Sequence, residues 1–144
     1  MVERLLAAVM DWAGNRHDIT GIALVGSHAR GQARPDSDVD LVLLTTEPAG
    51  LLEDAPWVKT FGKVASLGTE HWGNVTSLRV WYERGPEVEF GISTPDWAAL
   101  PPDPGAARVV RDGMTVLLDR HGALKAFADA VSRDDHAAAQ KGTR

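Results

Sequence analysis

The chain has 144 residues, of which 44% are hydrophobic, so it is long and apolar enough for one folded domain and is not a disordered protein. Its formal net charge is -5, which argues against binding a long nucleic acid, because phosphate contacts need clustered lysines and arginines. It has no cysteine, which excludes disulfides and thiolate chemistry, and neither a signal-peptide pattern nor an apolar run of membrane-spanning length, so we expect a cytoplasmic protein with no membrane partner.

The apolar spacing predicts a helix, then a series of strands, then a second helix. An amphipathic helix is expected over 2–16 and a short apolar strand over 21–25, which ends at a Gly-Ser pair. The next strand, 38–46, is apolar on both faces beyond its first residues, as is typical of a central strand. Further along we expect strands over 63–70, 75–83, 87–93 and 115–118, a proline-rich surface loop over 95–106, and a helix over 122–133.

This order of elements predicts an α/β (α+β) domain with a mixed, largely antiparallel sheet. The short breaks that flank the strand 75–83 suit antiparallel hairpins, and the helices are expected to pack on one face of the sheet. We expect residues 1–133 to form the domain and residues 134–144 to form a polar C-terminal tail.

One run of the sequence carries most of the chemical information. Gly26 and Ser27 follow the strand over 21–25, and ten residues separate Ser27 from the carboxylates Asp38 and Asp40. Side chains alternate along a strand, so the two carboxylates point to the same side and repel each other unless a cation lies between them. The Gly-Ser turn offers backbone N–H groups and a hydroxyl to a phosphate. The combination predicts metal-assisted phosphoryl or nucleotidyl transfer.

A third carboxylate from a neighbouring strand would complete such a site. Glu89 is the first candidate, because apolar neighbours flank it in the middle of the strand over 87–93. Glu87, at the strand start, and Glu83, before it, remain alternatives. We therefore expect Asp38, Asp40 and Glu89 to be both the catalytic residues and the ligands of Mg²⁺, which takes carboxylate and phosphate oxygens. Glu89 or a nearby carboxylate is also a candidate to accept the proton of the acceptor hydroxyl.

Several other polar and aromatic residues have both a functional and a structural interpretation. Arg30 and Arg34 are candidates to contact phosphates; a solvated or fold-bracing role is favoured for Arg30, and the role of Arg34 is left open. Ser37 belongs to the loop before Asp38 and is a further candidate for nucleotide binding. Four of the five tryptophans are candidates either for stacking on a base or ring or for packing in the core and hairpins, and packing is favoured for most of them: Trp57, Trp72, Trp81 and Trp97.

The run Gly26-Ser27-His28-Ala29-Arg30-Gly31, with Ser37-Asp38-Val39-Asp40-Leu41, resembles the polymerase-β-type nucleotidyltransferase superfamily. It is most similar to the bacterial small-molecule, aminoglycoside-type and minimal nucleotidyltransferases. The resemblance implies the nucleotidyltransferase fold, Mg²⁺ as cofactor and a nucleoside triphosphate, ATP in the first place, as donor. It implies metal-binding roles for Asp38, Asp40 and Glu89. The nucleotide contacts are then expected from Gly26, Ser27, Arg30 and Ser37.

The acceptor is left open by the sequence. The leading hypothesis is a Mg²⁺-dependent enzyme that moves NMP from an NTP to a hydroxyl of a small molecule. The larger relatives carry a second, mostly helical domain, so here the acceptor would be held by a second copy of the chain, by another protein, or by the segments 47–72 and 95–106. One alternative is a minimal antitoxin that binds or AMPylates a HEPN-type partner, and another is a degenerate nucleotide-binding domain.

Overall fold

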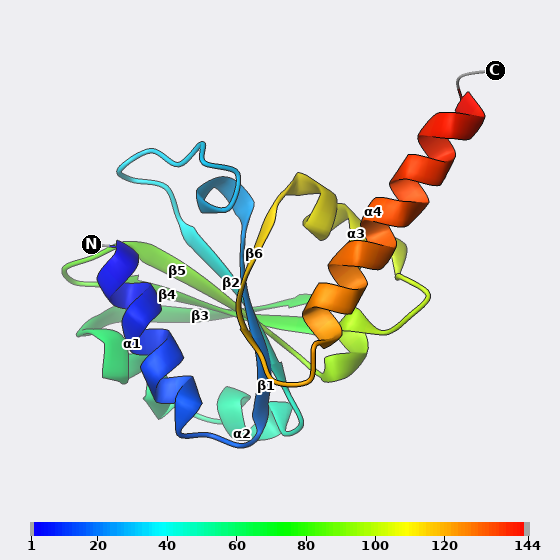
Figure 1. Cartoon of the computed structure of the whole chain (residues 1–144). Helices are drawn as coiled ribbons and strands as arrows, with labels where there is room; N and C mark the ends of the chain where they lie inside the picture. Colours follow the sequence, from blue (N-terminus) through cyan, green and yellow to red (C-terminus); the bar gives the residue numbers. More distant parts are fainter. Residues whose placement is uncertain (1, 143–144) are drawn as a thin grey trace.

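One mixed β-sheet forms the centre of the computed structural model, which describes residues 2–142 and their side chains up to residue 136. Its strands are Ile19–Val25 (β1), Val39–Thr45 (β2), Val64–Trp72 (β3), Val75–Tyr82 (β4), Glu87–Ser93 (β5) and Met114–Asp119 (β6). The six strands lie in the order β3-β4-β5-β2-β1-β6 (Figure 1). Strands β2 and β5 run parallel, and every other neighbouring pair is antiparallel. The α+β class and the largely antiparallel sheet are therefore confirmed.

Helices cover both faces of the sheet. They are α1 (Val2–Gly14), α2 (Pro48–Leu52), α3 (Pro104–Asp112) and α4 (Ala123–Gly142), with 3-10 helices over Gly26–His28, Pro56–Phe61 and Pro95–Ala98. Helix α1 lies on one side of the sheet and α3 and α4 lie on the other (Figure 1). The expectation that the helices pack on one face is wrong. The reason is that the central strand β2 is apolar on both of its faces, and each apolar face needs a cover.

The first core lies between α1, α2 and one face of the sheet. Val9 of α1 and Leu51 of α2 are completely buried against apolar side chains of β1, β2, β4 and β5. Aromatic rings complete this core: Trp12 stacks on Trp57 with 4.8 Å between ring centroids, and Trp57 meets Phe90 edge-on at 4.9 Å. Trp57 is thus a core residue, as its structural interpretation predicts.

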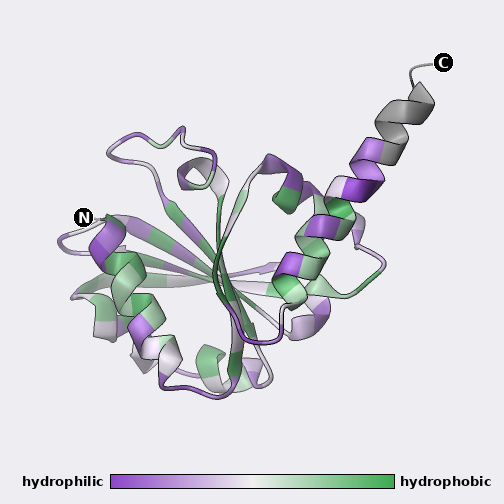
Figure 2. Cartoon of the chain, viewed as in Figure 1, coloured by the Kyte–Doolittle hydropathy of each residue, from purple (hydrophilic) through white to green (hydrophobic). Residues whose placement is uncertain are grey.

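The second core lies under α3 and α4 on the opposite face. Leu124 and Phe127 of α4 are completely buried there, together with Ala23 of β1 and Leu44 of β2. Figure 2 shows hydrophobic residues along the central strands and hydrophilic residues along the loop that joins β1 to β2. The sheet is thus anchored on both faces where β1 and β2 run through its centre.

Two helical segments differ from the sequence expectation. The segment 95–106, expected to be a surface loop, contains a 3-10 helix and the first turn of α3. The side chain of Asp103 caps α3 by accepting hydrogen bonds from the backbone N–H groups of Gly105 and Ala106. Helix α4 continues to Gly142, past residue 133, so the segment 134–142 is helical. Across residues 2–142 we find no helix with the length and apolar character that spanning a bilayer requires.

Charged hydrogen bonds fasten the connection between α1 and β1 to the sheet. Asp18 accepts two hydrogen bonds from the guanidinium of Arg16, at 3.1 and 3.0 Å, and one from the hydroxyl of Thr45 at 3.4 Å. Directly after β6, Arg120 donates to the carbonyl oxygens of Ile19 and Ala13, at 2.8 and 2.9 Å. These contacts join the chain segment before β1 to the strands on both of its sides.

The salt link at Asp18 predicts a pH-dependent stability. The hydrogen bonds from Arg16 lower the pKa of Asp18 against the opposing effect of burial. The stabilisation is therefore complete above the aspartate pKa of the unfolded chain, about 3.9, and is lost as the pH falls through the lower pKa of the folded state. We expect Asp18→Asn to lower the free energy of unfolding at pH 7 by about 1 kcal/mol.

Urea unfolding between pH 3 and pH 7 measures this effect. Asp18→Asn should flatten the loss of stability on acidification, whereas Asp11→Asn, at an exposed position on α1, should leave the slope unchanged. Equal pH slopes for wild type and Asp18→Asn would contradict the assignment.

Candidate active site

Asp38, Asp40 and Glu89 meet at one end of the two parallel strands. Asp40 lies directly beside Glu89 in the β2–β5 register and opposite Val25 at the end of β1. Asp38 precedes β2, and the alternation of side chains places it on the same face of the sheet as Asp40. The structure thus brings together the three carboxylates that the sequence singles out.

Gly26 allows the chain to turn tightly over Asp40. Its φ is +74°, in the left-handed region, and a Cβ added there would lie 2.4 Å from the Oδ2 atom of Asp40. Any side chain at this position would therefore displace the carboxylate. The glycine is needed both for the turn and for the close approach of backbone to Asp40.

The loop between β1 and β2 folds back on itself and forms a pocket above the carboxylates. The backbone N–H of Arg34 donates to the hydroxyl of Ser37 at 2.7 Å, and the ring of His28 lies 3.3 Å from the carbonyl oxygen of Ser37. The pocket measures about 530 Å³. The residues that line it are Gly26, Ser27, Arg30, Asp36, Ser37, Asp38 and Asp40.

All four predicted nucleotide-contacting residues therefore share one pocket with two of the predicted metal ligands. Arg30 reaches Gln32 with a hydrogen bond of 3.3 Å, and its backbone and side chain pack beside Gly113 at the start of β6. Both interpretations of Arg30 thus have a structural basis. Arg34 does not line the pocket and contributes its backbone N–H to the loop instead.

Burial and neighbouring negative charge raise the pKa of both Asp38 and Asp40. Burial, followed by the neighbouring carboxylates of Glu89 and Asp38, raises the pKa of Asp40 to about 7. Burial and the nearby Glu87 also raise the pKa of Asp38, although Arg79 opposes the shift. Such shifts mark a place where negative charge is in excess and where a bound cation would be stabilising.

Arg79 provides the positive charge next to these carboxylates, and sequence reasoning missed it. It lies on β4 directly opposite Glu89, and its guanidinium is 3.2 Å from Asp38 and 3.5 Å from Glu89. It also pairs with Glu70 at 3.2 Å and with Glu87. The alternation along the strand 75–83 would place Arg79 on the polar face, but only the register with β5 reveals its partner.

The two other glutamate candidates have different surroundings. Burial alone would raise the pKa of Glu87, but hydrogen bonds with Arg79 and Asp38 hold it below its usual value. Glu83 follows β4, and its carboxylate lies 3.5 Å from the amino group of Lys63. Of the three glutamates, Glu89 is the one beside Asp40 in register.

The carboxylates of this site suit a divalent cation whose ligands come partly from the protein and partly from a bound nucleotide. Among residues 2–142 no group of three histidine, aspartate or glutamate side chains is arranged to hold a metal on its own. Mg²⁺ in nucleotide-dependent sites takes only one or two protein carboxylates and completes its shell with phosphate oxygens and water. Asp38 and Asp40, which both line the pocket, meet this requirement, and their raised pKa values indicate that a cation would stabilise the ionised pair.

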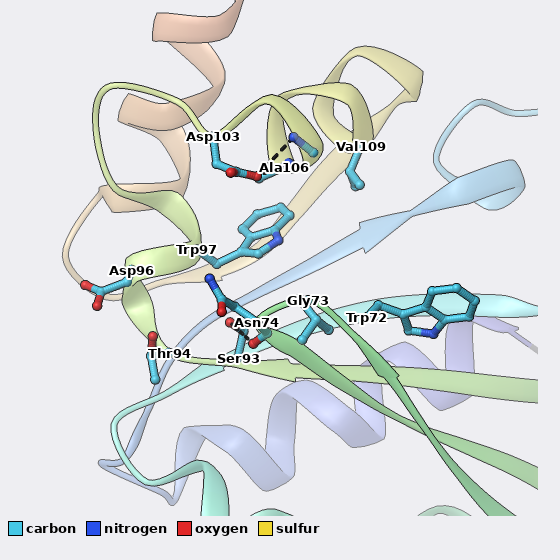
Figure 3. Close-up of a pocket in the computed structure, with 12 residues that line it drawn as sticks. Trp72, Gly73, Asn74, Ser93, Thr94, Asp96, Trp97, Asp103, Ala106 and Val109 are labelled. Carbon is cyan, nitrogen blue, oxygen red and sulfur yellow. Dashed lines mark hydrogen bonds between the residues drawn. The ribbon is translucent and has the colours of Figure 1, made fainter.

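A second, larger pocket of about 770 Å³ lies at the other end of the same sheet face. Its walls come from the β3–β4 turn, the end of β5, and the segment from Thr94 to α3. In Figure 3, Trp97 lies between α3 and Asn74 of the turn, Trp72 stands farther along the same side, and Asp96 points outward. The indole of Trp72 is 60% exposed, so it offers a free aromatic surface.

The lining of this pocket contains two carboxylates and no basic side chain. Asp96 and Asp103 belong to it, and none of its residues is a lysine, arginine or histidine. Ser93 lies at the floor of this pocket, four residues after Glu89 on β5 and on the same face of the strand. Four residues of a strand span roughly 13 Å. The pocket is therefore on the same face as the carboxylates and within reach of one extended small molecule.

The sheet and the helices that cover it have the layout of the nucleotidyltransferase fold, and comparison with known proteins gives the family. The family model of streptomycin adenylyltransferase matches residues 1–91, so the chain belongs to that family. Among solved structures, an aminoglycoside 6-adenyltransferase from Bacillus subtilis is similar, with a TM-score of 0.53 and 20% sequence identity. That likeness covers 65% of this chain and 35% of the other, and it confirms the nucleotidyltransferase fold. No curated protein matches the chain.

Gly26 gives a sharp test of the site geometry. Gly26→Ala should place a methyl group against Asp40 and lower the affinity for a nucleoside triphosphate with Mg²⁺ by about tenfold or more, since both the carboxylate and the turn must shift. Isothermal titration calorimetry with ATP measures the loss. Gly31→Ala is the matched control, because Gly31 has a similar φ of +71° but open space around its Cβ position. Equal affinities in the two variants would contradict the proposed role of the turn.

Proposed function

We propose that this domain transfers a nucleoside monophosphate from a nucleoside triphosphate to a hydroxyl group of a small molecule, with release of pyrophosphate and with Mg²⁺ as cofactor. The observation that carries the proposal is the single pocket in which the Gly26-Ser27 turn faces Asp38 and Asp40, with Glu89 directly beside Asp40. A carboxylate pair next to backbone N–H groups is what phosphates and their metal ions require. The family name favours ATP as the donor.

Each part of the site receives a role in this proposal. Asp38 and Asp40 would hold the divalent cation, which when bound neutralises phosphate charge and makes the acceptor hydroxyl more acidic. The turn at Gly26 and Ser27, with Arg30 and Ser37 at its edge, would orient the triphosphate. Glu89 completes the carboxylate set and is the group we assign to accept the proton of the hydroxyl.

The pocket between Trp72 and Trp97 is the place we propose for the acceptor. Its aromatic walls suit the C–H face of a ring, while its carboxylates and the absence of basic lining residues suit a hydroxylated molecule that is neutral or positively charged. The similar solved structure is that of an enzyme named for an aminoglycoside substrate, which fits this chemistry. The likeness covers 35% of the length of that enzyme. The acceptor of this chain is therefore proposed from the chemistry of the pocket and not from the substrate of the relative.

The decisive experiment follows label transfer from each of the four nucleoside triphosphates to a panel of hydroxylated small molecules in the presence of Mg²⁺. Asp40→Asn should reduce the rate by about 100-fold or more, because the metal loses a charged ligand. Asp36→Asn is the matched control, since Asp36 lines the same pocket but is exposed and has no metal role in the proposal.

Three results would separate the hypotheses raised by the sequence. Equal rates for Asp40→Asn and wild type would contradict the proposed chemistry. Label on a HEPN-type partner protein, with none on small molecules, would support the antitoxin alternative. ATP binding that is independent of Mg²⁺ and leads to no transfer would support a degenerate nucleotide-binding domain.

The acceptor pocket makes a separate prediction. Trp72→Ala should raise the KM for the acceptor about tenfold and leave the KM for ATP unchanged, because one aromatic wall is lost while the carboxylate site is intact. Steady-state kinetics on the active acceptor measure both values. Leu67→Ala, another exposed apolar truncation on β3, is the control. An increase in the KM for ATP alone would show that Trp72 acts on the donor side.

A further inference from the structure

Arg79 is surrounded by carboxylates, among them Asp38, which the proposed function assigns to the metal, and Glu89, which it assigns to proton transfer. Its guanidinium lies 3.2 Å from Asp38, 3.5 Å from Glu89 and 3.2 Å from Glu70, and it also pairs with Glu87. The arginine side chain is 22% exposed, so these contacts are partly shielded from water. Within residues 2–142, the ion pairs found for Asp38 and Glu89 are those with Arg79.

This arrangement places one positive charge among several negative ones. Four carboxylates contact Arg79 directly, and Asp40 lies next to one of them, Glu89. Without a cation, the cluster would consist of like charges on one sheet face, which is unfavourable. Arginine suits this place because its planar guanidinium presents several N–H donors and contacts more than one carboxylate at a time.

We infer that Arg79 is a resident counter-cation that pairs with Asp38 and Glu89 in the metal-free domain and competes with a divalent cation for Asp38. The inference rests on the proposed function in one respect, namely that a divalent cation binds at Asp38 and Asp40. A free divalent cation must compete with the Arg79 contacts and enter a field that the guanidinium has already partly neutralised. The affinity of the site for a divalent cation is therefore lower than the number of carboxylates alone would give.

A purely structural role for Arg79 makes the opposite prediction. If the arginine only braced the strands, its removal would loosen the carboxylates and weaken metal binding. If it competes with the metal, its removal leaves the carboxylates uncompensated, which lowers the stability of the metal-free domain and strengthens metal binding. The sign of the change in metal affinity thus separates the two roles.

The test measures binding of Mn²⁺ alone, without nucleotide, by electron paramagnetic resonance of the free ion. Arg79→Met should bind Mn²⁺ about tenfold more tightly than wild type, because one opposing charge is removed from a partly shielded site. Its melting temperature without metal should be lower than that of wild type, and saturating Mn²⁺ should restore most of the difference. Arg79→Lys, which keeps the charge but loses the fork of donors, should lie between the two in affinity.

Two controls keep the outcomes distinct. Arg111→Met removes an arginine that pairs with Asp135 at 2.7 Å and does not line the carboxylate pocket, so it should leave Mn²⁺ binding unchanged. Asp40→Asn should abolish the tight binding in both the wild-type and the Arg79→Met backgrounds. If Mn²⁺ binding does not depend on Asp40, the metal site of the proposed function is wrong and the inference falls with it.

If binding depends on Asp40 but Arg79→Met binds Mn²⁺ no more tightly than wild type, the inference alone is wrong. Should Arg79→Met fail to fold, Arg79→Lys takes its place with the same criterion: tighter Mn²⁺ binding than wild type supports competition, and equal or weaker binding overturns it.

Discussion

The parallel pairing of β2 with β5 is the constraint on which the site depends. In a sheet whose other pairs are antiparallel, this pair places Asp40 beside Glu89 at the starts of both strands. An antiparallel pairing would bring the end of β5, near Ser93, next to Asp40, and would separate the carboxylates by the length of a strand. Parallel neighbours need a long crossover, and the chain provides one with the segment 46–86, which contains α2 and the β3–β4 hairpin.

Keeping several carboxylates together has a cost in free energy, and the fold shows how it is offset. The strand β2 that carries Asp40 is buried on both faces, because α1 covers one core and α3 and α4 cover the other. The apolar contacts on both sides hold the strand in register although its first residues repel their neighbours. Arg79 then neutralises part of the remaining charge from β4. The helices on both faces are thus a requirement of the site as well as of the core.

Sequence reasoning succeeded where a feature is local and failed where it depends on distant pairing. The turn at Gly26 and the alternation of Asp38 and Asp40 can be read from fifteen neighbouring residues, and apolar neighbours placed Glu89 on the polar face. Arg79 is not predicted from the sequence, because its contact with Glu89 depends on the register between β4 and β5, which no local pattern encodes. Helix α3 is not predicted for another reason: the prolines of this segment indicate a loop, although Pro104 after the capping Asp103 is a typical helix start.

The proposed donor site and the proposed acceptor pocket differ in how the chain builds them. The donor site comes largely from one continuous segment, Gly26 to Asp40, whereas the pocket combines the β3–β4 turn, the end of β5 and α3. The family model matches residues 1–91 and therefore includes the donor site but ends before Ser93, Trp97 and Asp103. Most of the pocket thus lies outside the matched region. Family membership therefore carries information about the nucleotide, whereas the identity of the acceptor has to be sought in the chemistry of the pocket itself.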